Sequence, residues 1–190
     1  MIQIQDHPLK SVVENALSLM PDWSLRGCGI QQITFEDLGV SAEYTPNHGY
    51  YVNRRLALNE QMVDDTTEFY DPTTGRRLGI IPFILYHEIG HGFDEMLGLV
   101  SEQEQWTSLS GWSKTPFKGA RRITITDQGQ VTEGEWCFDP NKSKFARYYS
   151  MRNPWDDFAD SFAFYVSGMH GFLDPKKIKF LDDCASFVGE

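Results

Sequence analysis

Two histidines and a glutamate near the middle of the chain have the spacing of a metal-dependent hydrolytic site. His87, Glu88 and His91 follow the strongly apolar segment IIPFILY at 80–86. Histidines four positions apart on a helix share one face, so both imidazoles can bind one ion. In this H-E-x-x-H arrangement Zn2+ lowers the pKa of a water, and the glutamate is its general base. The alternative is a surface helix with two solvated histidines, but the apolar segment favours a buried helix that binds zinc.

A catalytic zinc ion needs a third protein ligand, and the sequence indicates an acidic side chain from a second helix. A metzincin would have glycine at 94 and histidine at 97, where this chain has Asp94 and Leu97. The remaining histidines, at positions 7, 48 and 170, lie in no ligand-like context. A carboxylate further along the chain is therefore the better candidate.

The segment after residue 152 supplies such a helix. Asn153 as N-cap and Pro154 as first helical residue form a strong start signal. Asp156 and Asp160 then lie one turn apart on one arc, whereas Asp157 is expected to project nearer to solvent. Asp156 is thus the better ligand of the adjacent pair. The structural alternative is that Asp156 closes a capping box with Asn153, because carboxylates are favoured in any first helical turn.

Together the two segments resemble the lethal-factor-like zinc metallopeptidases, gluzincin-type zincins that include the secreted Pro-Pro endopeptidases. The family pattern H-E-x-G-H-x-x-D is similar to HEIGHGFD at 87–94. The family also has a tyrosine, a glutamate ligand seven positions later, and then F-A-E; here Tyr149, Asp156 and the segment FAD at 158–160 match. The likeness covers roughly residues 50–181 and is specific only at these motifs. Aspartate stands in place of glutamate at both 156 and 160, which shortens each side chain by one methylene.

The resemblance implies a catalytic role for five residues. His87, His91 and Asp156 would be the zinc ligands, and Glu88 would be the general base. Tyr149 would donate a hydrogen bond to the oxyanion of the tetrahedral intermediate.

The resemblance also implies supporting residues. Asp160 would orient a ligating imidazole through its other ring nitrogen, and Asp94 would support the site in a less defined way. Two alternatives stay open. Asp157 could be the ligand, with the tyrosine spacing then off by one, and Tyr148 could be the hydroxyl donor.

The predicted elements favour the α+β class, because strands come early in the chain and helices dominate late. We expect helices at 8–20, 80–97, 141–149, 154–169 and 175–188, strands at 29–35 and 50–58, and a hairpin at 121–135. A single domain over 1–190 is expected, with a sheet-containing part at about 1–98 and a mainly helical part at about 99–190. The resemblance implies a zincin-like fold with a small twisted mixed sheet. Segment 50–58 is either the substrate-binding edge strand of such a fold or an ordinary sheet strand.

Composition, charge and the length of apolar segments disfavour several classes of partner and location. Asp and Glu outnumber Lys and Arg by 27 to 17, so the net charge of −10 disfavours nucleic acids and anionic membranes as partners. The longest apolar stretch, 79–86, is too short to span a bilayer. The N-terminal residues do not have the pattern of a signal peptide, which predicts a cytoplasmic protein or export by a signal-independent route. Cys28, Cys137 and Cys184 are expected to be idle thiols.

The sequence therefore predicts a zinc-dependent metalloendopeptidase that hydrolyses a protein or peptide substrate, and the resemblance implies a toxin or effector role. Two other classes stay open. One is a catalytically weak or inactive binding module with a zinc fold, to which aspartate at position 156 gives weight. The other is a zinc hydrolase of a non-peptide amide. Cleavage preference and oligomeric state do not follow from the sequence.

Overall fold

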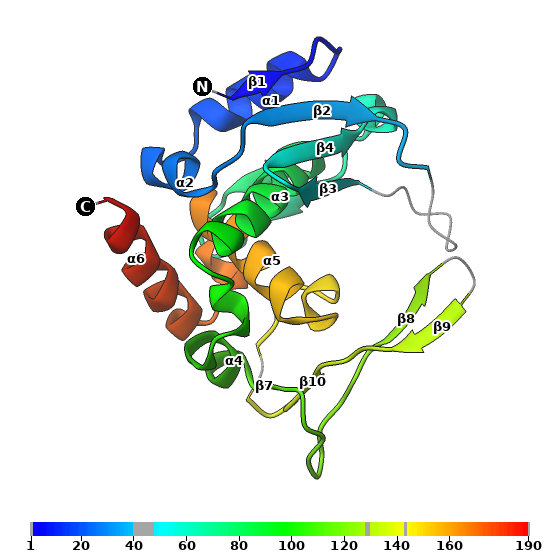
Figure 1. Cartoon of the computed structure of the whole chain (residues 1–190). Coiled ribbons are helices and arrows are strands. Elements are labelled where there is room, and N and C mark those ends of the chain that lie inside the picture. Colours follow the sequence, from blue (N-terminus) through cyan, green and yellow to red (C-terminus); the bar gives the residue numbers. More distant parts are fainter. Residues whose placement is uncertain (1, 40–47, 128–129, 143, 190) are drawn as a thin grey trace.

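The molecule combines helices with several small sheets, which is consistent with the predicted α+β class (Figure 1). The computed structural model describes residues 2–39, 48–127, 130–142 and 144–189. Its α-helices are α1 (Lys10–Ser18), α2 (Asp22–Gly27), α3 (Ile80–Met96), α4 (Glu104–Ser110), α5 (Pro154–Val166) and α6 (Pro175–Gly189). Its strands are β1 (Gln3–Ile4), β2 (Gln32–Glu36), β3 (Gly49–Val52), β4 (Arg55–Asn59), β5 (Glu68–Tyr70), β6 (Arg77–Gly79), β7 (Trp112–Ser113), β8 (Thr124–Asp127), β9 (Gln130–Glu133) and β10 (Cys137–Phe138).

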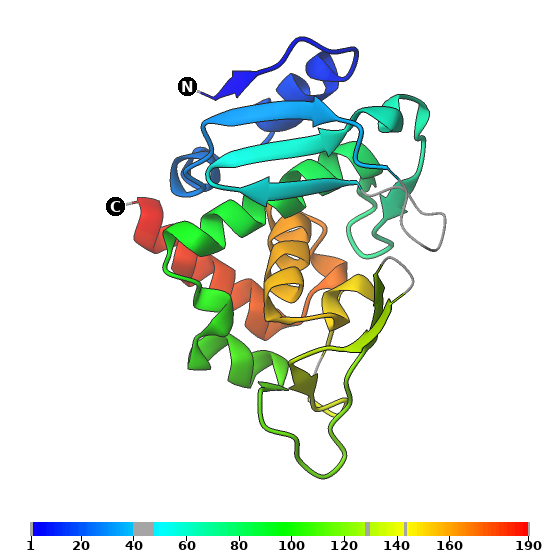
Figure 2. The ribbon, with the colours of Figure 1, turned by 45° about the vertical axis from the view of Figure 1, so that its right-hand side comes forward.

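The largest sheet is mixed, and β3 lies at its edge. The strand order is β1-β2-β4-β3, with β2 parallel to both β1 and β4 and with β3 antiparallel to β4 (Figure 2). The prediction of one strand region over 50–58 is wrong, because two strands occupy it. Asn53 and Arg54 form the turn between them, with φ of 49° and 64°. Two successive left-handed residues are typical of the tight turns that match the twist of a hairpin.

Helix α3 lies between this sheet and α5 (Figure 2). It contacts β3 and β4 on one side and α5 on the other. Its apolar residues Phe83, Leu85 and Ile89 are fully buried, as the composition of segment 80–86 predicts. Pro82 is tolerated in the first turn, where backbone N–H groups have no partner within the helix.

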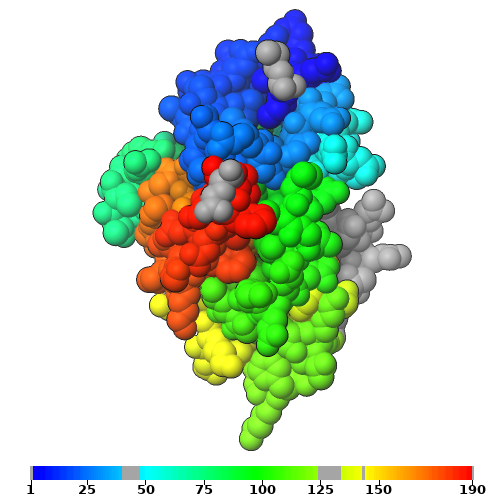
Figure 3. All heavy atoms as spheres, turned by 60° about the vertical axis from the view of Figure 1, so that its left-hand side comes forward, coloured from blue at the N-terminus to red at the C-terminus, as the bar shows by residue number. Residues whose placement is uncertain are grey.

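One hydrophobic cluster contains residues from both parts of the chain, for example Val13, Leu58, Phe162 and Leu181. Helices α2 and α6 contact each other, so the N-terminal and C-terminal regions adjoin on one face (Figure 3). A smaller cluster consists of Trp112, Ile123, Trp136 and Phe138. The three tryptophans between the two motifs, Trp106, Trp112 and Trp136, are all buried, so they are core residues.

The predicted helix at 141–149 is wrong, because the described residues before Tyr149 form turns, bends and irregular backbone, and Tyr149 begins a 3-10 helix of three residues. Side-chain contacts with distant elements explain the irregular backbone. The ring of Phe145 packs on Trp112 and Phe138, with centroids 5.3 and 4.9 Å away, and the guanidinium group of Arg147 binds Asp160 of α5. These contacts compete successfully with the local preference for a helix.

Other differences from the predicted elements are small. Helices α2 and α4 were not predicted; each is too short to show a helical period. Strands β8 and β9 form the predicted hairpin, whose expected turn residues 128–129 lie outside the described part. The three cysteines are free thiols. Among the described residues no helix has the length and apolar character needed to cross a membrane.

Candidate metal centre

The close approach of α3 and α5 brings the two predicted motifs together. Gly90 lies between the two histidines of α3, and a Cβ atom there would be only 3.0 Å from the Cα atom of Ala159 on α5. Glycine facing alanine therefore lets the helix backbones pack closely. Helix α5 begins where the sequence indicates, because the side chain of Asn153 accepts a hydrogen bond from the Asp156 N–H at 2.7 Å.

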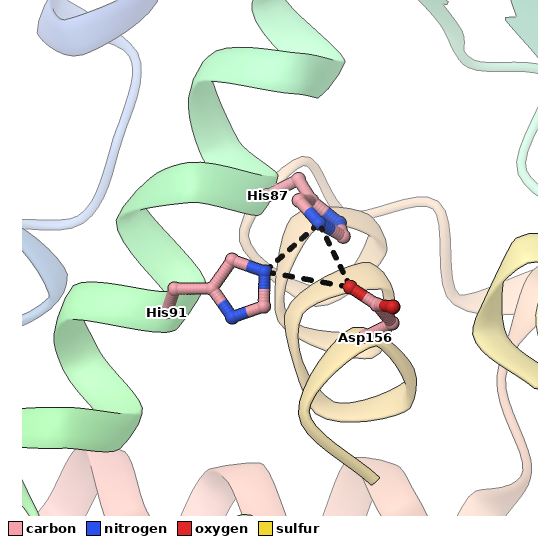
Figure 4. Close-up of side chains that lie close together, drawn as sticks. All are labelled: His87, His91 and Asp156. Atoms are coloured by element: carbon pink, nitrogen blue, oxygen red, sulfur yellow. Dashed lines mark hydrogen bonds and ion pairs between the residues drawn. The ribbon is translucent and has the colours of Figure 1, made fainter. Parts of the chain in front are cut away.

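His87, His91 and Asp156 point toward a common position between these helices (Figure 4). The Nε2 atoms of the two histidines are 3.1 Å apart. Oδ1 of Asp156 lies 3.6 Å from Nε2 of His91 and 3.8 Å from Nε2 of His87. Ligand atoms at ~2.1 Å from a tetrahedral zinc ion are separated by ~3.4 Å. The three side chains therefore could hold a metal ion, and aspartate at 156 reaches the group despite its shorter side chain.

The orientation of His87 is set by its other ring nitrogen. Nδ1 of His87 lies 2.8 Å from Oδ1 of Asp160, the residue that the resemblance implies as the partner of a ligating imidazole. Burial raises the pKa of Asp160, but the hydrogen bond with His87 and the charge of Arg147 outweigh burial and lower it to about 2. Because Asp160 is ionised, it accepts a hydrogen bond from the Nδ1–H of His87, and the lone pair on Nε2 is left for a metal.

Glu88 is almost completely buried beside the histidines and lines the cleft next to them. Burial raises the pKa of its carboxyl group, the charges of Asp156 and Asp160 raise it further, and the two histidines oppose the rise. Edge strand β3 passes close by: a Cβ atom on Gly49 would be 3.2 Å from Cγ of Glu88. This carboxylate is therefore confined to the cleft, with a raised proton affinity.

Tyr149 lies at the mouth of the same cleft, with 36% of its surface exposed. Its ring is 5.7 Å from that of His87. Burial and the charge of Asp156 raise its pKa, so the hydroxyl is protonated at neutral pH and can donate a hydrogen bond. Tyr148, the alternative donor, is 72% exposed and does not line the cleft.

Asp94 is buried and lines the cleft, but its hydrogen bonds go to Ser101 rather than to either histidine. Its side chain accepts from the backbone N–H of Ser101 at 2.8 Å and from the hydroxyl at 2.5 Å. Leu99, two residues before Ser101, is in the left-handed region with a φ of 57°. Asp94 thus fixes the turn that follows α3 and lines the cleft.

The expectation that Asp157 faces solvent is wrong. Asp157 is completely buried and accepts hydrogen bonds from the ammonium group of Lys177 on α6 and from Nε1 of Trp112. Ser161, one turn later, is also completely buried. Helix α5 is covered on this side by α4 and α6, which the helical period alone does not indicate. Asp157 therefore points away from the two histidines, and among the residues that the structure describes it belongs to no group that could hold a metal ion.

A cleft of about 560 Å³ connects these residues with the edge of the main sheet. Its walls include Tyr51 and Val52 of β3, the two histidines of α3, and Trp155 of α5. In the described part of the chain, β3 pairs with β4 alone, so its outer edge faces the cleft. An extended peptide could pair with such an edge.

Three residues of the site were not predicted from the sequence. Arg147 and Ser150 donate hydrogen bonds to Asp160, and Arg152 lies 3.9 Å from Oδ2 of Asp156. Their closeness to Tyr149 in the sequence was the only available signal, since nothing distinguishes these residues from ordinary solvated side chains.

Comparison with known proteins assigns no family to the chain. No protein-family model matches the sequence, and no curated protein matches it.

Proposed function

We propose that this protein is a zinc-dependent metallopeptidase. The observation that carries the proposal is the convergence of two imidazole nitrogens and one carboxylate oxygen, 3.1–3.8 Å apart, in a cleft that also contains Glu88. His87, His91 and Asp156 would hold the metal. Histidine and carboxylate ligands at this spacing suit zinc, and three protein ligands leave a fourth position free.

A zinc ion held by these residues supplies a Lewis acid that lowers the pKa of water and polarises a carbonyl group. The chain itself supplies the proton transfer. Glu88 lies beside His87 with a raised pKa, so its carboxylate takes a proton from the attacking water and returns it to the leaving amine nitrogen. A glutamate with a low pKa would take up that proton less readily.

Tyr149 and strand β3 act on the substrate in this proposal. The neutral hydroxyl of Tyr149 donates a hydrogen bond to the developing oxyanion. The outer edge of β3 pairs with the substrate backbone, which holds the peptide extended along the cleft. An open edge strand beside the site favours a peptide substrate over a small amide.

The arrangement also supports a zincin-like fold of the lethal-factor type. A mixed sheet with an antiparallel edge strand lies against the H-E-x-x-H helix, and the third ligand comes from a second helix that starts at Asn153 and Pro154. Tyr149 lies seven residues before that ligand, as in the family pattern.

The proposal is tested by measuring the metal content of the purified protein and its cleavage of an unbiased peptide library, with and without chelator. We expect about one zinc ion per chain, and cleavage that chelator abolishes and added zinc restores. Glu88→Gln should keep the zinc and lose activity, by at least about 100-fold. Glu104→Gln, the same exchange at an exposed residue of α4, is the matched control and should keep both.

Three results would contradict the proposal. Loss of zinc in Glu88→Gln would make Glu88 a structural residue. A full complement of zinc without turnover of any peptide would favour a binding module. Turnover of small amides alone would favour a non-peptide hydrolase.

A further inference from the structure

We propose that Arg147 is a positioning residue that couples the orientation of His87 to the placement of the Tyr149 ring. Arg147 lies in the irregular segment before α5. Its guanidinium group contacts both the carboxylate of Asp160, which binds His87, and the aromatic ring of Tyr149. The catalytic part of this inference rests on the proposed function, but the structural part does not.

Arg147 acts on the orientation of His87 through Asp160. The guanidinium group of Arg147 binds this carboxylate with two hydrogen bonds, from Nε to Oδ2 and from Nη2 to Oδ1, each 2.8 Å long. The hydroxyl of Ser150 donates to Oδ2 at 2.7 Å, and Nδ1 of His87 lies 2.8 Å from Oδ1. Asp160 is completely buried, so it needs the cation to remain ionised there. A bidentate contact also fixes the plane of the Asp160 carboxylate, and hence the orientation of the His87 ring.

Arg147 acts on Tyr149 through a contact between its guanidinium group and the face of the tyrosine ring. The guanidinium carbon of Arg147 lies 4.8 Å from the centroid of the Tyr149 ring and 4.6 Å from that of Phe83 on α3. A second guanidinium group, that of Arg152, lies 4.7 Å from the Tyr149 centroid. Nε of Arg152 is also 3.9 Å from Oδ2 of Asp156. The tyrosine ring is therefore held by two cations, and each of them is close to one carboxylate of the site.

These ring contacts matter because little else holds the tyrosine. It is 36% exposed, and its hydroxyl has no hydrogen-bond partner among the described residues. An aromatic side chain with a free hydroxyl can rotate toward solvent unless its ring faces are held. Arg147 is thus placed to keep the ring of Tyr149 beside that of His87, while its hydrogen bonds to Asp160 hold the orientation of His87.

A fluorine label on Tyr149 tests the placement of the ring without zinc and without substrate. With 3-fluorotyrosine at position 149, Arg147→Met should narrow the fluorine resonance and move it toward the position of free fluorotyrosine. Arg152→Met removes the second cation without touching Asp160, and should have the same effect to a smaller degree. Arg26→Met, the same exchange at an exposed arginine of α2, is the matched control and should leave the resonance unchanged.

Zinc affinity, measured by competition with a chelator, tests the His87 half. Loss of a residue that orients a metal ligand typically weakens binding ~10–100-fold, and we expect this for Arg147→Met but not for Arg152→Met. Arg147→Lys keeps the charge but not the bidentate contact with Asp160. Its zinc affinity should therefore lie between those of Arg147→Met and wild type. It also provides a folded variant if Arg147→Met is unstable.

A double-mutant cycle tests whether the coupling reaches catalysis. With zinc saturating, Arg147→Met should lower kcat by ~10-fold or more with a smaller effect on KM. In the Tyr149→Phe background the same exchange should lower kcat by only about two- to threefold, because the group it positions is already gone.

Unchanged fluorine spectra in folded Arg147→Met and Arg152→Met would overturn the Tyr149 half of the proposal, and unchanged zinc affinity in Arg147→Met and Arg147→Lys would overturn the His87 half. Equal effects of Arg147→Met on kcat in both backgrounds would overturn the link to catalysis. If the wild-type protein cleaved no peptide, the proposed function would fail, while the fluorine and zinc measurements would still decide the role of Arg147.

Discussion

Asp156 and Asp157 are adjacent in the sequence but have unrelated partners in the structure, so replacing each with alanine should separate metal binding from stability. Asp156→Ala removes the oxygen that lies 3.6 Å from Nε2 of His91. It also removes a hydrogen bond from Asn153, worth about 1 kcal/mol. We therefore expect the Tm of the metal-free protein to fall by only ~2–4 °C and the zinc affinity to fall by more than about 100-fold, since loss of a ligand exceeds loss of its supporting residue.

Asp157→Ala should do the opposite. The carboxylate of Asp157 is completely buried, and its ion-pair partner, the ammonium group of Lys177, lies in a side chain that is 2% exposed. Removing one member of a buried ion pair costs about 3–5 kcal/mol, because the other charge stays buried without a partner. At ~2–4 °C per kcal/mol for a domain of this size, the Tm should fall by ~6–20 °C. Zinc affinity of the folded variant should stay within about threefold of wild type, because Asp156 keeps its place.

The assays are thermal unfolding followed by circular dichroism and zinc affinity measured by chelator competition. Asp157→Leu combined with Lys177→Met replaces both charges by apolar groups, and should recover much of the lost Tm. The reasoning is refuted if a folded Asp157→Ala protein loses its zinc, or if Asp156→Ala retains full affinity. The first result would make Asp157 the ligand, and the second would exclude Asp156 as a ligand.

Three further predictions concern the helix contact, the metal and a buried turn. Gly90→Ala places a Cβ atom 3.0 Å from the Cα atom of Ala159, so both Tm and zinc affinity should fall. The same exchange at Gly189, which has no atom within 4 Å of the added Cβ, should change neither. Zinc at 100 times its Kd should stabilise the wild-type protein by about 2.7 kcal/mol, measured as a chelator-sensitive rise in Tm that is absent in Asp156→Ala. Asp71→Ala should cost about 1–3 kcal/mol at neutral pH, because the N–H groups of Thr73 and Gly171 lose their acceptor. Burial raises the pKa of Asp71, but these donors outweigh burial and the net pKa is lowered. Its stabilisation is therefore complete above about pH 4 and is lost as the pH falls through the lower folded-state pKa. Unfolding curves should show the difference between variant and wild type shrinking on acidification, and a constant difference would contradict this account.

The parts of the site that lie on one helix could be predicted from the sequence. The apolar segment before His87 predicts a buried helix, and Asn153 with Pro154 predicts the start of α5. These inferences depend on spacing within one element, where the helical period relates position to direction. The grouping of His87, His91 and Asp156 followed from such local signals together with a family resemblance.

Predictions failed where a distant element decides the local structure. Asp157 was expected to face solvent, but α6 brings Lys177 against it. Segment 141–149 was expected to be helical, but contacts of Phe145 and Arg147 with other elements hold it in turns. A hydrophobic period shows which residues share a face, and not what covers that face.

The sequence by itself determined which side chains could bind a metal and which of them share a helix face, because both depend on residue type and on the fixed rise and turn of the helix. Only the tertiary structure decided that α5 packs closely against α3 at Gly90, and that β3 is an edge strand beside the cleft. The tertiary structure also decided that Arg147 contacts both Asp160 and Tyr149. The reason is that these relations join segments tens of residues apart. They arise from packing and hydrogen bonding among whole elements, which a local pattern does not specify.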